Sequence, residues 1–351
     1  MRILHLANHH IFSDAGHFYM CDRKFSSGFD RLGHCVYDYS YKDMLRASNV
    51  FRSSKLGRRK VAEQLRGIAQ AFQPDILLLG HVNLPRELLD DLRAARPSMQ
   101  VIGWFVDYVE DRRVGHLRAM ASAMDALYVT TGGEPLRALG HELGVPVIGY
   151  LPNPVHPALE SGRVWEHESW DYDLVYCGAD RKAPARRQLL EQLVDKLPKV
   201  RMAIRGSLDQ PPVYGQEYLD LLQRSLCGLN LSKHHDLYWY SSDRIAQLTG
   251  NGLCTLSQRI PGFEKLYGED EVVYFDGEAE LVDKIRYLAE HPAEAAAIGQ
   301  RGWQKAHGSF HVDRICRYML EGVEGNFSED YLWLDSYFQN RKSGGRYLEL
   351  G

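Results

Sequence analysis

The sequence predicts an α/β protein of two Rossmann-like, doubly wound domains, and three observations support this prediction. Short apolar runs bounded by turn residues alternate with helical patterns in both halves of the chain, as in parallel sheets covered by helices. The length of 351 residues suits two domains of ordinary size. Three prolines lie between Leu151 and Pro157, where they disfavour helix and stiffen the chain.

These observations divide the chain into five parts. The prediction is a first domain over 1–151, a proline-rich hinge over 152–170, a second domain over 171–325, an amphipathic helix over 326–340 and a flexible tail over 341–351. The last helix rests on aromatic and aliphatic residues at helical spacing, namely Phe327, Tyr331, Leu334 and Phe338.

The composition excludes several classes of protein. With 44% hydrophobic and 25% charged residues, the chain is typical of a soluble globular protein. Its net charge of -4 argues against a nucleic-acid-binding protein, which normally carries a basic excess. Six scattered cysteines without a CxxC pair favour free thiols in a reducing compartment. No signal peptide or membrane span is evident, so we expect a cytoplasmic location.

The first domain shows a regular alternation of elements. A buried strand is expected at 2–7 and further strands at 35–39, 76–79, 101–106, 126–130 and 147–150, with helices at 25–32, 51–72, 85–95, 114–124 and 134–141. The helix over 51–72 has an apolar stripe, and its start is rich in lysine and arginine. Such a basic start is either a solvated charged face or a weak peripheral contact with anionic lipid at the inner face of a membrane.

The loop that follows the first strand is long and polar, and binding and catalytic residues often lie in such loops. It contains Asp14 and His17, which are candidate catalytic groups. Asp107 follows the strand at 101–106 and is expected at the same edge of the sheet. Histidine and aspartate also bind metals, but their spacing here matches no zinc motif, so no metal site is predicted.

The second domain is organised around residues 240–276. Strands are expected at 173–177, 200–204, 228–232, 253–256 and 272–275, with helices at 184–197, 215–222, 278–288, 292–307 and 311–323. Ser241 and Ser242 open one further short helix and Pro261-Gly262 opens another, both at the carboxyl ends of parallel strands. Helix N-termini at that edge are where α/β sheets bind phosphates.

A sequence pattern in this segment is similar to that of a known family. Ser242-x-Arg244-x-x-Gln247-x-x-x-x-Gly252 is followed by Pro-Gly-Phe-Glu-x-Leu-Tyr and Glu-Val-Val-Tyr-Phe-Asp. This order resembles the donor-binding half of CgeB-like glycosyltransferases, of the glycosyl transferases group 1 type, over about residues 173–307. The chain departs from the pattern at Gln247, where many relatives carry a glutamate that bonds the ribose. An amide retains donors and acceptors for that bond.

The resemblance implies a GT-B fold, whose last helix commonly crosses back to the N-terminal domain. It implies a nucleotide-sugar donor site in the second domain, with phosphates held at helix N-termini. The donor-binding residues implied are Gly178, Arg186, Arg187, Ser241, Ser242, Arg244, Gln247, Gly262, Phe263 and Glu264.

The activity implied is transfer of a sugar to a bacterial surface glycan, lipid-linked glycan or related glycoconjugate, as in polysaccharide or lipopolysaccharide biosynthesis. No metal or other cofactor is expected. An inverting reaction needs a base, and Asp14 is preferred over His17 and Asp107. The alternatives are a nucleotide-sugar epimerase on the same scaffold, a non-catalytic nucleotide-sugar-binding relative and, more distantly, a metal-dependent hydrolase that uses His9, His10, Asp14 and His17.

Overall fold

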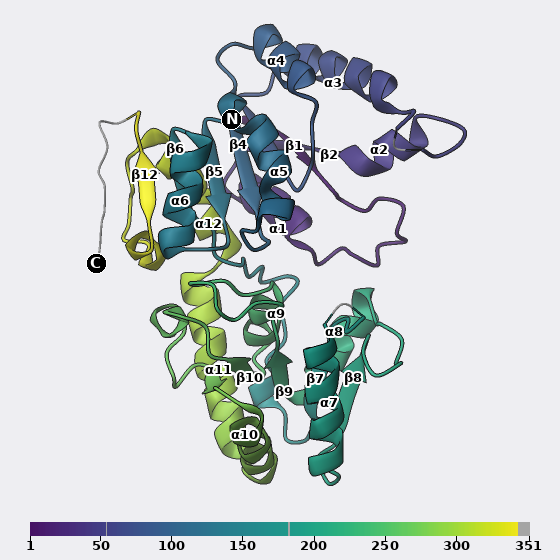
Figure 1. Cartoon of the computed structure of the whole chain (residues 1–351), viewed down its shortest axis with the longest axis vertical. Helices are drawn as coiled ribbons and strands as arrows, with labels where there is room; N and C mark the ends of the chain where they lie inside the picture. Colours follow the sequence, from purple (N-terminus) through teal and green to yellow (C-terminus); the bar gives the residue numbers. More distant parts are fainter. Residues whose placement is uncertain (54, 182, 343–351) are drawn as a thin grey trace. The chain divides into compact units, whose positions relative to one another are not determined.

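The computed structural model describes residues 1–53, 55–181 and 183–342, which form two compact units (Figure 1). The first unit combines Met1–Pro152 with the segment from Val312 onward, and the second unit is Asn153–His311. The predicted two-domain α/β fold is therefore present. Residues 343–351, most of the predicted tail, lie outside the described residues.

The first unit is built on a mainly parallel sheet. Among the described residues it has seven strands in the order β12-β6-β5-β4-β3-β1-β2, of which only β12 is antiparallel. The strands are β1 (Arg2–Ala7), β2 (Cys35–Ser40), β3 (Ile76–Gly80), β4 (Gln100–Phe105), β5 (Ala126–Val129), β6 (Val147–Tyr150) and β12 (Phe338–Asn340). The winding changes direction between β1 and β3, so the carboxyl ends of these two strands flank a switch point.

Helices connect these strands in the order expected of a doubly wound fold. They are α1 (Cys21–Arg31), α2 (Tyr41–Ala47), α3 (Arg58–Phe72), α4 (Arg86–Ala95), α5 (Asp111–Met120), η1 (Ala121–Ala123), α6 (Gly133–Leu143), α12 (Val312–Glu324) and η4 (Leu332–Asp335). The helix predicted from residue 51 begins only at Arg58, and the short α2 was not predicted. Gly57, directly before this start, lies close to α2, because an added Cβ there would lie 2.0 Å from the Leu45 carbonyl oxygen.

The prediction of a helix over 326–340 is wrong. That segment contains η4 and β12, and β12 pairs with β6 through Gln339 opposite Ile148. Its aromatic residues surround Tyr318 of α12 rather than forming one helical stripe, with Phe327 and Phe338 in contact at 5.0 Å between ring centroids. Pairing with the open edge of β6 gives the backbone its hydrogen bonds without a helix.

Helix α12 belongs to the first unit, although residues 312–325 were predicted to lie in the second domain. It packs against α1, and Gly28 allows the close approach, because an added Cβ would lie 2.7 Å from Cys316 Sγ. Arg31 of α1 also donates to Asp313 at 2.9 Å. The C-terminal helix that packs on the N-terminal unit is thus Val312–Glu324.

The second unit is a smaller parallel sheet. Among the described residues its five strands run in the order β11-β10-β9-β7-β8. The elements are β7 (Tyr172–Cys177), β8 (Met202–Arg205), β9 (Ser225–Asn230), β10 (Cys254–Gln258), β11 (Val273–Phe275), η2 (Val164–Glu166), α7 (Pro184–Lys196), α8 (Gly215–Gln223), α9 (Arg244–Gly250), η3 (Phe263–Lys265), α10 (Glu278–Glu290) and α11 (Pro292–Ser309). Leu193, Leu229 and Leu281 are among its fully buried core residues. The winding changes direction between β7 and β9.

The structure describes the state of the cysteines and the hydropathy of the helices. All six cysteines are free thiols, and four of them are buried. None of the helices in the described part of the chain is both long and apolar enough to cross a bilayer.

Candidate functional site

The strongest candidate site lies in the second unit, where β7 and β9 end side by side. Strand β7 ends at Cys177 and is followed by Gly178, and β9 ends at Asn230 and is followed by Leu231. The sheet order places the change of winding between these two strands. Open α/β sheets bind ligands at such a point, beyond the carboxyl ends of the strands.

Arg244, at the start of α9, bridges the ends of these two strands. Its Nε donates to the Cys177 carbonyl at 2.9 Å, and its Nη1 donates to the Leu231 carbonyl at 3.1 Å and to Ser242 Oγ at 3.3 Å. The guanidinium also lies over the Tyr176 ring, 5.3 Å from its centroid. These contacts fix a positive charge at the switch point of the sheet.

Arg186 of α7 reaches the same place from the other side. Its Nη1 donates to the Ala179 carbonyl at 2.7 Å, and its Nη2 donates to the Leu231 carbonyl at 3.0 Å, so both arginines share one carbonyl oxygen. Burial, the largest cause, lowers the pKa of Arg186, and the charge of Arg244 lowers it further. Among the described residues neither arginine has a carboxylate partner. Two such charges attract an anion.

The neighbouring arginine is placed differently. Arg187 pairs with Asp209 at 2.8 Å, with Glu191 at 2.9 Å and with Asp180 at 3.4 Å. Its charge is thus compensated within the unit. Of the two arginines that the sequence could not separate, Arg186 is the one available to a ligand.

Three buried polar atoms near Arg186 have no hydrogen-bond partner among the described residues. They are Tyr176 Oη, Arg186 Nε and His235 Nδ1. Buried polar groups in native proteins are nearly always bonded, and an unbonded group needs an explanation. Three such atoms lie beside two cations without an ion-pair partner, and they are available to a polar ligand or to water.

His235 is a residue that the sequence analysis did not select. It lies in the loop between β9 and α9, and burial, the largest cause, lowers its pKa to about 4. The ring is therefore neutral near pH 7 and can accept a hydrogen bond at one nitrogen. Its position after a strand at the carboxyl edge of the sheet was the available signal, but the long loop concealed which side chains point inward.

The serines of this segment form the frame behind the arginines. Ser241 is fully buried, and its Oγ accepts a bond from Asn230 Nδ2 at 3.1 Å. Asn230 also donates to Ser257 Oγ at 3.0 Å, which ties β9 to β10. Ser242 is half-buried beside Arg244. Of the two serines, Ser242 is the one near the charged pair, and Ser241 supports it from within.

Gln247 is occupied by its neighbours in this structure. Its Oε1 accepts from the Tyr218 hydroxyl at 2.7 Å, and its Nε2 donates to Asp243 Oδ2 at 2.9 Å. The side chain is buried, with 7% of its surface exposed. These contacts make Gln247 a link between α8 and α9. A hydrogen bond from Gln247 to a ribose requires that its bond to Tyr218 or to Asp243 be broken.

The remaining donor-site predictions fall in the turn after β10. Gly262 has φ +72°, and an added Cβ would lie 2.4 Å from the Tyr238 ring, so glycine is required there. Phe263 is buried and stacks on Tyr267, while Glu264 is exposed. The structure thus gives Phe263 a packing contact and leaves the Glu264 carboxylate in solvent.

The helix starts in this region are shorter than expected. Helix α9 has seven residues, and the predicted helix after Pro261 is only the three-residue η3. A helix dipole grows with the number of aligned peptide units, so these two contribute little field. The positive charge of the site comes mainly from Arg186 and Arg244.

The three predicted catalytic residues of the first unit have different surroundings. Asp14 is exposed, with φ +49°. His17 stacks on His10 with 4.7 Å between ring centroids. Asp107 is paired with Arg113, which also covers the Tyr108 ring at 4.3 Å.

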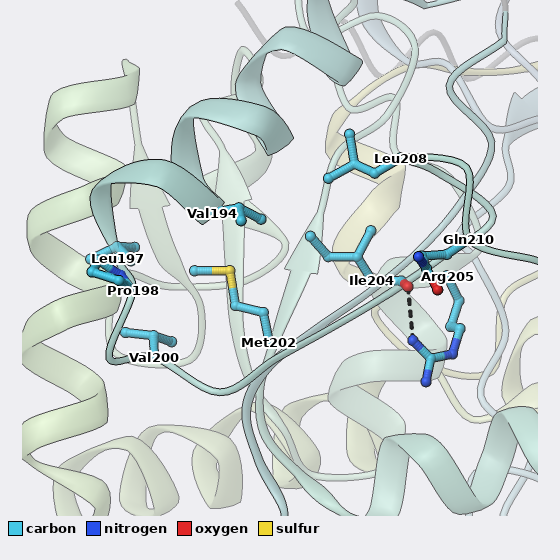
Figure 2. Close-up of a pocket in the computed structure, with 9 residues that line it drawn as sticks. All are labelled: Val194, Leu197, Pro198, Val200, Met202, Ile204, Arg205, Leu208 and Gln210. Carbon is cyan, nitrogen blue, oxygen red and sulfur yellow. Dashed lines mark hydrogen bonds between the residues drawn. The ribbon is translucent and has the colours of Figure 1, made fainter.

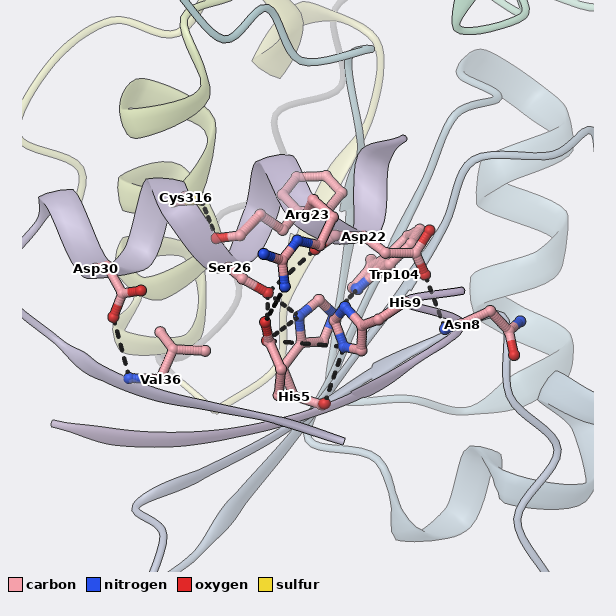
Figure 3. Close-up of polar contacts among 12 residues, drawn as sticks. His5, Asn8, His9, Asp22, Arg23, Ser26, Asp30, Val36, Trp104 and Cys316 are labelled. Atoms are coloured by element: carbon pink, nitrogen blue, oxygen red, sulfur yellow. Dashed lines mark hydrogen bonds and ion pairs between the residues drawn. The ribbon is translucent and has the colours of Figure 1, made fainter. Parts of the chain in front are cut away.

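A polar network in the first unit extends from the buried His5 to the partly exposed Asp38 (Figure 3). Trp104 Nε1 donates to His5 Nε2 at 3.1 Å, His5 Nδ1 lies 2.8 Å from Ser26 Oγ, and Ser26 Oγ donates to Asp38 at 2.5 Å. His9 Nε2 lies 3.7 Å from the same carboxylate. An indole N–H only donates, so His5 Nε2 must accept and Nδ1 must carry the proton.

This tautomer bears on metal binding. His5, His9 and Asp38 are close enough together to hold an ion, with ligand atoms within 4.8 Å of one another. A metal at His5 Nδ1 would need the lone pair that the proton occupies. The three side chains are better described as a hydrogen-bonded network that joins β1, α1 and β2. This trio also differs from His9, His10, Asp14 and His17, the set considered from the sequence.

A separate groove lies at the edge of the second unit (Figure 2). It has a volume of about 470 Å³ between the end of α7 and edge strand β8, and Leu197, Met202, Ile204 and Leu208 line it. Arg205 Nη1 there donates to the Ile204 carbonyl at 2.9 Å. None of the donor-site residues lines this groove.

Part of the sequence matches a family model, and the fold is similar to those of solved structures. Residues 181–321 match a family model described as "Glycosyl transferase-like". Sucrose-phosphate synthase from Thermosynechococcus elongatus superposes with a TM-score of 0.57 at 13% identity, covering 93% of this chain and 98% of that one. Anabaena HepE in complex with UDP and glucose gives 0.58 at 12% identity, covering 93% and 100%. An α1,3-fucosyltransferase gives 0.50 at 11%, covering 94% and 91%.

No curated protein matches the sequence significantly. The structural likenesses, at these low identities, establish the fold, which is GT-B. The match over 181–321 contains Arg186, His235 and Arg244, so the arginine pair lies inside the glycosyl transferase-like segment.

Proposed function

Because a GT-B fold here carries a glycosyl transferase-like segment, we propose that the protein is a glycosyltransferase that binds the phosphates of a nucleotide sugar between Arg186 and Arg244. The observation that carries the proposal is that both guanidinium groups bond the Leu231 carbonyl at the β7 and β9 switch point. Within the described residues no carboxylate forms an ion pair with either guanidinium, and Asp180 acts on Arg186 only at longer range. A phosphate is the anion for which arginine geometry is best suited.

The chemistry follows from where charge develops. When the bond between the sugar and the phosphate oxygen breaks, the leaving phosphate gains negative charge and the sugar gains oxocarbenium character. Carbonyl oxygens and the Tyr176 ring already hold the two cations, so little reorganisation is needed at that moment. We propose that these arginines do the work that a divalent ion does in other transferases, and that the reaction proceeds in EDTA.

Uridine nucleotides are the first donors to test, since HepE was solved with UDP and glucose. Calorimetric titration of UDP, GDP, ADP, TDP and CMP in EDTA gives the base preference directly. One nucleotide that binds far more tightly than the others supports the donor site. If none binds, with or without divalent metal, the proposal is wrong.

The acceptor side is proposed on the first unit. Asp14 is our preferred base, because its carboxylate is exposed on a loop beyond β1, whereas that of Asp107 is held by Arg113. Asp14→Asn is expected to abolish transfer and to leave nucleotide binding unchanged. Activity near that of the wild type would move the role to His17 or Asp107.

We propose a bacterial surface glycan or lipid-linked glycan as acceptor, and the cytoplasm as the site of reaction. Free cysteines agree with a reducing compartment. Incubation of the donor with and without candidate acceptors separates transfer from the alternatives. Conversion of the donor sugar without acceptor would indicate an epimerase, and binding without any turnover would indicate a non-catalytic relative.

A further inference from the structure

The loop between α2 and α3, together with most of α2 and the first residues of α3, exposes a combination of apolar and basic side chains. We call residues 42–60 the basic loop segment; Ser54 within it lies outside the described residues. Val50 is 96% exposed, Phe51 83% and Leu56 62%. Large apolar side chains at such exposure, clustered in one short stretch, mark an interaction site rather than ordinary surface.

The charge of the segment is strongly positive. It has seven lysine or arginine residues and one carboxylate, so its net charge is +6, whereas the whole chain carries -4. The seven cations, Lys42, Arg46, Arg52, Lys55, Arg58, Arg59 and Lys60, are all exposed. Among the described residues only Arg59 has an acidic partner, Glu63 at 3.0 Å.

The one carboxylate of the segment does not balance this charge locally. Asp43 is buried, and it accepts from Ser40 Oγ at 2.5 Å and from the Ile11 backbone N–H at 2.9 Å. It therefore serves as an internal anchor. It also ties α2 to the loop after β1, whose Ile11 and Phe12 are 53% and 63% exposed and which carries the carboxylate of Asp14.

The apolar tip is held outward by an ordered turn. Asn49 Nδ2 donates to the Leu45 carbonyl at 3.0 Å and to the Ser53 carbonyl at 2.7 Å, and Asn49 Oδ1 accepts from the Ser53 N–H at 2.9 Å. These bonds close the turn around Val50 and Phe51. The exposed side chains are thus displayed by a defined loop, which lowers the entropy lost when they bind.

We propose that the basic loop segment docks on an anionic lipid bilayer, with Val50, Phe51 and Leu56 inserted among the headgroups and the seven cations held at the lipid phosphates. A soluble acidic glycan would satisfy the cations but would leave the apolar side chains in water. A bilayer interface accommodates both. Because the segment is tied to the loop that contains Asp14, the surface would bring a lipid-linked acceptor to the proposed acceptor side; this last step rests on the proposed function.

The test is co-sedimentation of the full chain with vesicles of phosphatidylcholine alone and of phosphatidylcholine with phosphatidylglycerol. We expect binding to the anionic vesicles that weakens as salt is raised. Each basic residue near an anionic surface contributes roughly fivefold, about 1 kcal/mol. Combined Arg58→Gln, Arg59→Gln and Lys60→Gln should therefore lower the binding constant roughly a hundredfold.

The apolar component is tested separately. Phe51→Ser should weaken vesicle binding roughly tenfold, because one aromatic ring no longer leaves water. The matched control is Val194→Ser in the second unit, where an apolar side chain of 48% exposure is replaced with no expected effect on vesicle binding. Dextran sulfate serves as a soluble polyanion.

Two results would overturn the proposal: no binding to anionic vesicles, or binding that Phe51→Ser leaves unchanged and dextran sulfate fully displaces. The second would identify an electrostatic site for acidic polymers. These readouts need no nucleotide and no turnover. Failure of the membrane proposal and failure of the transferase proposal are therefore distinguishable.

Discussion

Arg186 and Arg187 are adjacent residues of one helix with opposite surroundings, and this contrast allows a sharp test of the donor site. Among the described residues the hydrogen bonds of Arg186 go to carbonyl oxygens, and Arg187 is paired with three carboxylates. Arg186→Gln removes a charge that has no ion-pair partner from the switch point, and Arg187→Gln removes an ion-paired charge from the same helix. The two variants have the same change in net charge, so long-range effects are matched.

The expected magnitude follows from the contacts. A charge-assisted hydrogen bond to phosphate contributes roughly 1.5–3 kcal/mol, about 10- to 150-fold in Kd. Arg186 is half-buried, so water screens it only in part. Its replacement also removes repulsion with Arg244, so we expect the free energy of unfolding without ligand to change by less than about 1 kcal/mol. Arg187→Gln should alter Kd by less than about threefold.

The assay is isothermal titration of the preferred nucleoside diphosphate, the matching monophosphate and the free nucleoside. The loss in Arg186→Gln should be large for the diphosphate, smaller for the monophosphate and nearly absent for the nucleoside. An equal loss for all three would show that Arg186 supports the fold and does not contact phosphate. A diphosphate affinity as high as that of the wild type, or an equal loss in Arg187→Gln, would refute the assignment.

Three further predictions concern Gln247, Gly178 and His81. Gln247→Ala removes the bonds to Tyr218 and Asp243, so it should lower the free energy of unfolding by roughly 1–3 kcal/mol in urea titration and leave donor affinity nearly unchanged. A lower donor affinity with an unchanged free energy of unfolding would instead support a ribose contact. Gly178→Ala places a Cβ 2.8 Å from Arg244 Nη2, so donor affinity should fall roughly tenfold while circular dichroism stays constant; normal affinity would contradict the packing. Burial is the largest cause that lowers the pKa of His81 from 6.5 to about 4. The stability that neutral His81 preserves is therefore complete above pH 6.5 and is lost as the pH falls toward 4. At pH 5 this loss lowers the free energy of unfolding by about 2 kcal/mol. His81→Gln should flatten the stability profile over this range, and an unchanged slope would assign the effect to other groups.

Most of the fold could be predicted because burial leaves a direct pattern in the sequence. Strands such as Ile76–Gly80 are buried throughout and read as unbroken apolar runs. The prediction of a helix over 326–340 was wrong because the aromatic residues there have helical spacing for another reason. They surround Tyr318, while the backbone is taken up by β6. Spacing records which residues are buried and does not record which neighbour buries them.

The candidate site was predictable only where side chains carry the chemistry. Arg244 and Ser242 stand in a recognisable pattern, and the structure brings them together. The Leu231 carbonyl, which joins Arg186 to Arg244, has no signature because every residue has a carbonyl. The engagement of Gln247 depends on Tyr218, a residue from a different helix. Such contacts arise from the tertiary fold, which local sequence does not encode.

The chain path has a consequence for biosynthesis. Residues 153–311 form a self-contained unit inserted into the other, whose sheet is completed by β12 pairing with β6. On the ribosome the inserted unit can finish folding first, while the N-terminal residues wait for α12 and β12 to emerge. During that interval β6 presents an unpaired edge, and chains that stall before residue 338 would be prone to edge-to-edge association. Chaperone demand should therefore concentrate on the first unit until β12 has been made.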